Sequence, residues 1–134
     1  MARRYLAEFD KGSHSVYLEY FHLVCVTKYR HKFINDHIAE IIRKNFCYVG
    51  RKYHITLEEF GFESDHCHFM FRASPRTDFT KFIGAFKSFS SRIVRDAFPS
   101  IAEHKAFWSP SYCLLTTGGA PIDIIKRYIQ KQKG

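Results

Sequence analysis

Two histidines separated by one residue are the side chains of this sequence best suited to chemistry. His66 and His68 lie in a run, 63–73, whose composition predicts a β-strand. Because side chains in a strand alternate between faces, both histidines point to one side, followed by Met70, while Cys67 and its apolar neighbours point to the other. Neutral imidazole is the commonest metal ligand, so the pair can bind one divalent cation. Ordinary surface or core histidines give the same pattern, and that alternative stays open.

A second pair of residues lies near the end of the sequence. Tyr128 and Gln132 are four residues apart in a segment with a helical pattern, so they lie one above the other on one helix face. A tyrosine phenol, with a pKa near ~10, is a poor nucleophile until its proton is accepted or charge is withdrawn. Two imidazoles and the Gln132 amide oxygen form a mixed ligand set that suits Mg²⁺ or Mn²⁺, and such a cation can polarise an attacked phosphate. This pattern predicts phosphoryl transfer through a phosphotyrosine, whereas a tyrosine that only packs its ring is the alternative.

Composition restricts the class of protein. The 134 residues are expected to form one domain, and 21 Lys and Arg against 13 Asp and Glu give a net charge of +8. This charge favours a polyanionic partner, with nucleic acid preferred over an anionic membrane. We expect a cytoplasmic protein, because the sequence has neither an apolar run of about 20 residues nor a signal peptide. Cys25, Cys67 and Cys113 lie among apolar strand residues and are predicted to be reduced core side chains.

The elements that position these residues alternate between strand and helix patterns. Strands are expected at 16–29, 55–62, 63–73 and 112–117. Three helices are expected. The first is capped by Asn35 or Asp36, the second follows a capping residue within 74–77, and the third begins at Pro121. Gly61 predicts a bulge or bend, and Gly118-Gly119 a hinge before the last helix, although an ordinary turn explains the two glycines equally well.

The order of elements, β-α-β-β-α-β and a final helix, predicts an α+β fold of the ferredoxin-like or RRM-like split βαβ type. It comprises an antiparallel sheet and a C-terminal helix that carries the nucleophile. The single domain covers 1–134, with an N-terminal arm at 1–15 and the tyrosine helix at 121–134. The histidines must lie on the free sheet face if the phenylalanines face the helices. Five basic residues are candidate DNA contacts: Lys28, Arg30, Arg51, Lys87 and Arg92. The last two lie on a helix face whose polar character is explained equally well by exposure to solvent.

Several segments, in the same order, resemble the single-tyrosine HUH transposases (TnpA) of small insertion sequences that move as single-stranded DNA, and their REP-associated relatives. The segments are 14–17, 21–30, 64–68, 86–92, 107–112 and 128–132. The family motif is His, a bulky hydrophobic residue and His, and here Cys67 takes the middle position.

The resemblance implies a role for each site residue. His66, His68 and Gln132 would bind the metal, and Tyr128 would be the nucleophile. The family binds DNA hairpins near element ends and cleaves a nearby single strand, leaving a 5′-phosphotyrosine and a free 3′-hydroxyl. The resemblance also implies homodimers in which the tyrosine helix of one subunit completes the histidine site of the other. Such a dimer could form through the open sheet edge that a domain of this type has.

Three other functions fit parts of the pattern. An RRM-like module that binds single strands would need Phe69 and Phe71 on the free face, and the alternation then excludes the histidines. A HUH replication or mobilisation nuclease would share the chemistry but carry further domains. A domesticated REP-associated nuclease would act on host repeats, and the neighbouring DNA would identify it.

Overall fold

Four antiparallel strands and the helices on one side of them make up the fold. The structure is a computed structural model that describes residues 18–116. Its elements are β1 (Glu19–Thr27), η2 (Lys28–Arg30), α2 (Asp36–Arg51), β2 (Thr56–Glu63), β3 (His66–Ala73), α3 (Phe79–Ala97), α4 (Pro99–Ala102) and β4 (Trp108–Thr116). The strand order is β2-β3-β1-β4, so β1 and β3 are central. This arrangement confirms the predicted α+β split βαβ fold.

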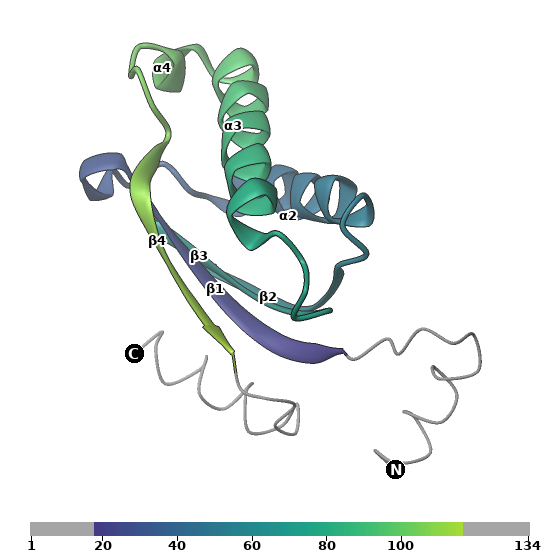
Figure 1. The fold of residues 1–134 in the computed structure, drawn as a ribbon. Coiled ribbons are helices and arrows are strands. Elements are labelled where there is room, and N and C mark those ends of the chain that lie inside the picture. Colours follow the sequence, from purple (N-terminus) through teal and green to yellow (C-terminus); the bar gives the residue numbers. More distant parts are fainter. Residues whose placement is uncertain (1–17, 117–134) are drawn as a thin grey trace.

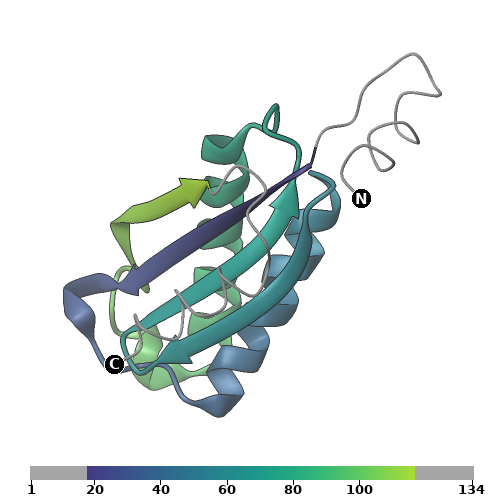
Figure 2. The same ribbon diagram turned by 90° about the horizontal axis from the view of Figure 1, so that it is seen from below.

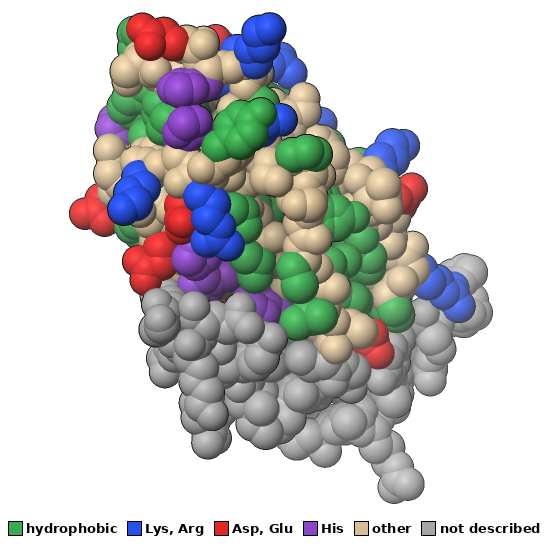
Figure 3. Space-filling model, turned by 90° about the vertical axis from the view of Figure 1, so that its left-hand side faces the viewer, with side chains coloured by type: hydrophobic (Ala, Val, Ile, Leu, Met, Phe, Trp, Pro, Cys, Tyr) green, Lys and Arg blue, Asp and Glu red, His purple; other side chains and the backbone are tan. Residues whose placement is uncertain are grey.

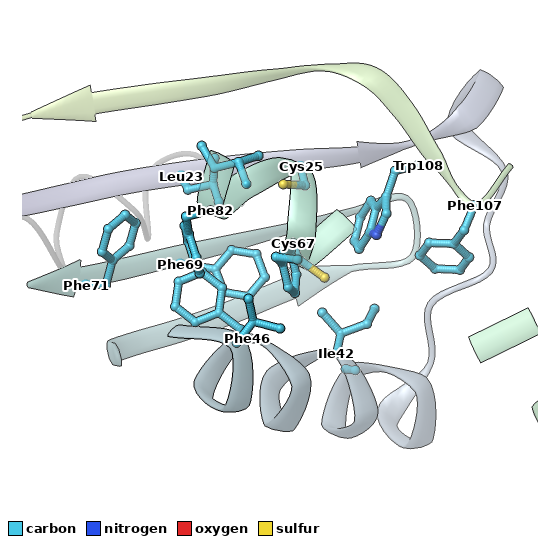
Figure 4. Close-up of a cluster of buried hydrophobic side chains, with 14 of the residues drawn as sticks. Leu23, Cys25, Ile42, Phe46, Cys67, Phe69, Phe71, Phe82, Phe107 and Trp108 are labelled. Carbon is cyan, nitrogen blue, oxygen red and sulfur yellow. The ribbon is translucent and has the colours of Figure 1, made fainter. Parts of the chain in front are cut away.

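Helices α2 and α3 cover one face of the sheet (Figures 1 and 2). Phe46 of α2 stacks on Phe69 of β3 with ring centroids 4.4 Å apart. Cys67, Phe69 and Phe71 of β3 are fully buried in this core (Figure 4). The predicted alternation along β3 is therefore correct, and the aromatic side chains needed by an RRM-like module face the helices instead of a ligand.

Capping residues determine where the two long helices begin. The Asn35 side chain accepts a hydrogen bond from the Ile38 amide at 2.9 Å, which confirms one of the two predicted caps of α2. The predicted cap of α3 is wrong. Asp78 accepts from the Lys81 amide there, while Ser74 accepts from the Arg76 amide in the preceding turn.

Polar contacts fasten α3 to the edge strand β4. The buried Trp108 indole donates a hydrogen bond to the Ser90 hydroxyl at 2.9 Å, and that hydroxyl donates to the Phe86 carbonyl at 2.7 Å. The Lys87 ammonium donates to the backbone carbonyls of Ser109 and Ser111. These contacts fix the beginning of β4, at Trp108, Ser109 and Ser111, against α3.

Two further local predictions fail. Cys113 is exposed because it pairs with Val24 on the sheet face away from α2 and α3, whereas Cys25 and Cys67 are buried as predicted. Gly61 pairs regularly with His68, and the bulge of β2 falls between Leu57 and Glu59. The predicted arm at 1–15, the glycine hinge and the tyrosine helix at 121–134 lie outside the described residues. Within 18–116, no helix has the length and apolar character needed to cross a bilayer.

Candidate functional site

His66 and His68 lie side by side near the start of the central strand β3. Their ring centroids are 5.9 Å apart and their ring planes differ by 31°. His68 is 2% exposed, and its neighbour Met70 is fully buried. Because Cys67 and Phe69 point into the core beneath α2 and α3, both imidazoles point away from those helices. The predicted pairing of these side chains on one face is therefore present in the structure.

Asp65 positions His66 from the turn between β2 and β3. Its Oδ1 lies 2.8 Å from His66 Nδ1, and its Oδ2 accepts from Arg30 at 3.3 Å. The hydrogen bond with His66, followed by that with Arg30, holds the pKa of Asp65 below its usual range. An ionised carboxylate only accepts hydrogen bonds, so Nδ1 of His66 donates this one and Nε2 is the ring nitrogen that could face a ligand. Metal-binding histidines commonly have such a carboxylate behind them.

A third histidine, to which the sequence analysis gave no role, lies beside this pair. His22 of β1 pairs with Met70, and its ring contacts that of His68 edge-on at a centroid distance of 6.1 Å. It is 2% exposed, and burial lowers its pKa, which favours the neutral imidazole. Alternation in β1 could have shown that His22 points away from its core neighbours, but only the register with β3 places it beside His68.

The other predicted chemical groups lie outside residues 18–116. These are the nucleophile Tyr128 and the third ligand Gln132. Within the described part of the chain, no cluster of three or more His, Cys, Asp or Glu side chains could bind a metal ion. The described site thus supplies two imidazoles, one of them oriented by a carboxylate, and ring nitrogens of this kind suit a divalent cation that takes further oxygen ligands.

The five candidate DNA contacts do not form one surface. Lys28 and Arg30 lie in η2, and Arg30 contacts Asp65. Arg51 and Arg92 pack over the rings of Tyr48 and Phe89, which contact each other where α2 meets α3.

Lys87 donates to carbonyls of β4, and burial lowers its pKa. Its ammonium is therefore used within the protein. Arg30 is linked to His66 through Asp65, and Lys28 lies in the same short helix η2. Figure 3 shows histidine, basic and acidic side chains gathered on the side where η2 and β4 lie in Figure 1.

Known proteins match this chain over most of its length. Residues 15–132 match the family described as Transposase IS200 like. The chain is 28% identical over 128 residues to ISDra2 transposase TnpA of Deinococcus radiodurans, a match that covers 93% of this chain and 91% of that protein. A crystal structure assigned to a transposase of Deinococcus radiodurans R1 has 30% identity and a TM-score of 0.70, covering 91% of this chain and 96% of that one.

A more distant structure shares the fold. It is a REP-associated tyrosine transposase bound to a REP hairpin, with 10% identity and a TM-score of 0.62, covering 87% of this chain and 66% of that one. Together these matches agree with the resemblance found in the sequence.

Proposed function

This chain belongs to the family of IS200-like transposases, and from that membership we propose that it cuts and rejoins single-stranded DNA through a covalent bond to Tyr128. A transposase is an enzyme that cleaves DNA and transfers strands. The observation that carries the finer proposal is the pairing of His66 and His68 on one face of β3, with Asp65 orienting the first imidazole. Together with the Gln132 amide oxygen, these nitrogens would bind Mg²⁺ or Mn²⁺.

The proposed reaction is a transesterification. The Tyr128 phenol oxygen attacks the phosphorus of a phosphodiester, and the bond from phosphorus to the 3′ oxygen breaks. The phenol gives up its proton and the leaving 3′ oxygen takes up one in exchange, so that the products are a free 3′-hydroxyl and a 5′ phosphate joined to the tyrosine. A 3′-hydroxyl of another strand then attacks the phosphotyrosine and restores the phenol. When bound, the cation supplies Lewis-acid stabilisation of the charge that develops on the phosphate.

The residues around the site have separate tasks in this proposal. Asp65 keeps the Nδ1 proton of His66 in place, so that Nε2 faces the ligand position. Lys28 and Arg30 contribute positive charge beside the site, where a DNA backbone would pass. The fastening of β4 to α3 by Ser90 and Trp108 fixes the strand that precedes the tyrosine segment.

The DNA partner is proposed to be a hairpin with an adjoining single strand. The net charge of +8 favours such a polyanion, and the REP-associated relative was solved with a REP hairpin. We further propose a homodimer in which each Tyr128 serves the histidine pair of the other subunit. A domesticated enzyme that acts on host repeats would use the same site, and the DNA flanking the gene distinguishes the two roles.

Cleavage of labelled single strands taken from that flanking DNA tests the proposal. Cleavage should require Mg²⁺ or Mn²⁺ and stop with a chelator. His66→Ala should abolish cleavage but leave binding largely intact, because phosphate contacts dominate affinity. His54→Asn is a matched control, since His54 is exposed, lies at a φ of 57° and has a backbone conformation that Asn tolerates. Full cleavage by His66→Ala, or in excess chelator, would refute the assigned metal site.

A further inference from the structure

Tyr29 is the most exposed large aromatic side chain in the described part of the molecule. It lies in η2 and is 82% exposed. Both Tyr29 and Arg30 have left-handed backbones, with φ values of 55° and 54°. Two consecutive residues of this size rarely adopt that conformation, and such geometry is found most often at functional sites. The fold therefore holds this ring in solvent at a backbone cost.

Hydrogen bonds fix the turn that presents Tyr29. The Thr27 hydroxyl donates to the His31 carbonyl at 2.7 Å and to the Asp65 carbonyl at 3.2 Å. The Lys28 amide donates to the Phe107 carbonyl at 3.0 Å. These contacts tie the residues on both sides of Tyr29 to neighbouring segments and so restrict the backbone that presents its ring.

A row of rings connects Tyr29 to the core. The His31 ring meets Tyr29 edge-on at 6.0 Å and lies 4.7 Å from His104, centroid to centroid. Phe33 contacts both histidines at 5.0 Å and stacks on the buried Phe107 at 5.7 Å. The outer end of this row is an exposed aromatic surface made by the Tyr29 ring, which stands edge-on to His31 with the two ring planes 85° apart.

Positive charge and the histidine site both adjoin this surface. The Lys28 ammonium lies 5.4 Å from the centre of the Tyr29 ring. Arg30 contacts Asp65, which in turn contacts His66. The row is therefore next to the residues proposed to handle the phosphodiester. Exposed aromatic rings beside cations are the combination that proteins use to stack unpaired bases while attracting the backbone.

We propose that Tyr29, His31 and His104 form a stacking platform for unpaired DNA bases that adjoin the bond to be cut. This inference rests on the proposed function, because it extends the single-strand site outward from His66. Paired bases in a duplex are already stacked on each other, so the platform would favour an open strand. Stacking on a ring is tolerant of sequence, and the platform would add affinity near the cut without reading which base is present.

The test compares two single strands that differ only in their bases. One is a fluorescein-labelled oligo-dT of about 15 nucleotides, and the other is an abasic strand of equal length, both within the usual range of single-strand sites. Binding is measured by fluorescence anisotropy with a chelator present, so that no chemistry is required. Tyr29→Asn removes the ring while accepting the left-handed backbone. It should raise the Kd for oligo-dT by between about fivefold and a hundredfold and leave the Kd for the abasic strand unchanged.

Two further variants separate the platform from general effects. Tyr29→Phe keeps the ring and should bind oligo-dT like the wild type. Tyr48→Ala removes another exposed tyrosine flanked by cations, on the surface of α2, and should also bind like the wild type. If Tyr29→Asn fails to fold, Tyr29→Gly takes its place, since glycine adopts positive φ without strain.

Each remaining outcome counts against a specific claim. If Tyr29→Asn loses equal affinity for both strands, or loses none for oligo-dT, the platform is overturned while the proposed function stays intact. Failure of the wild type to bind oligo-dT at all would contradict the single-strand substrate, and the platform with it. A change in molecular mass of Tyr29→Asn in light scattering would show that Tyr29 contacts a second protein chain, which also overturns the platform.

Discussion

Replacing Asp65 tests whether the carboxylate beside His66 prepares that imidazole for a cation. Asp65→Ala removes both the hydrogen bond to Nδ1 and the negative charge behind the ring. The His66 ring could then rotate, or its proton could move from Nδ1 to Nε2. Asp65→Asn keeps an oxygen that can accept from Nδ1 but loses the charge, so its effect should be intermediate.

The size of the effect follows from the contacts of Asp65. Loss of the partner behind a metal-bound histidine weakens metal binding about 10- to 100-fold, which corresponds to about 1.4 to 2.7 kcal/mol. The second contact, with Arg30, is 3.3 Å long and the Arg30 side chain is 68% exposed. Pairs of this kind contribute about 1 kcal/mol or less. Most of the loss should therefore come from the contact with His66.

Isothermal titration with Mn²⁺ measures this directly. We expect the Kd for Mn²⁺ to rise about 10- to 100-fold in Asp65→Ala and less in Asp65→Asn. Arg30→Ala is the matched control, since it breaks the ion pair but leaves the contact with His66, and it should change the Kd about fivefold or less. Unchanged Mn²⁺ affinity in Asp65→Ala, or an equally large loss in Arg30→Ala, would show that Asp65 does not prepare His66 for the cation.

Three other predictions concern the core and the assembly. Ser90→Ala leaves the buried Trp108 indole without its acceptor, so the free energy of unfolding should fall by about 1 to 3 kcal/mol in urea titrations; no change would show that the contact is dispensable. Burial raises the pKa of the Cys25 thiol from 9.0 to about 12. The unfolded chain therefore loses this proton first, and stability that is complete below pH 9 should decline between pH 9 and 12 in urea titrations. Cys25→Ala should reduce that decline. An identical pH profile in Cys25→Ala and the wild type would show that the Cys25 thiol does not cause the decline. Mixed His66→Ala and Tyr128→Phe chains should regain part of the cleavage activity, whereas no recovery after verified subunit exchange would argue for a site built within one chain.

Sequence patterns predicted the features that depend on alternation along a single element. The order of strands and helices follows from periodicity, and the placement of the β3 histidines opposite Phe69 follows from the two-residue repeat. The Asn35 cap could be predicted because its side chain acts on an amide three residues away. These contacts are local, so the sequence alone contains them.

Features that depend on contacts between elements could not be predicted in this way. Cys113 has an apolar strand neighbourhood, but its exposure follows from its pairing with Val24, which places it on the sheet face away from α2 and α3. The role of Lys87 follows from the approach of α3 to β4, and that of His22 from the register of β1 against β3. The bulge of β2 lies between Leu57 and Glu59, whereas Gly61 pairs regularly with His68, and only the register of β2 against β3 shows this.

The most direct test of the proposed reaction is to identify the residue that becomes joined to DNA. The protein is incubated with a labelled single strand from the flanking DNA and Mn²⁺, and the denatured product is digested and mapped by mass spectrometry. We predict one adduct, a 5′-phosphate ester of Tyr128, which disappears in Tyr128→Phe although that variant still folds and binds DNA. An adduct on another tyrosine, or cleavage that persists in Tyr128→Phe, would contradict the proposed reaction.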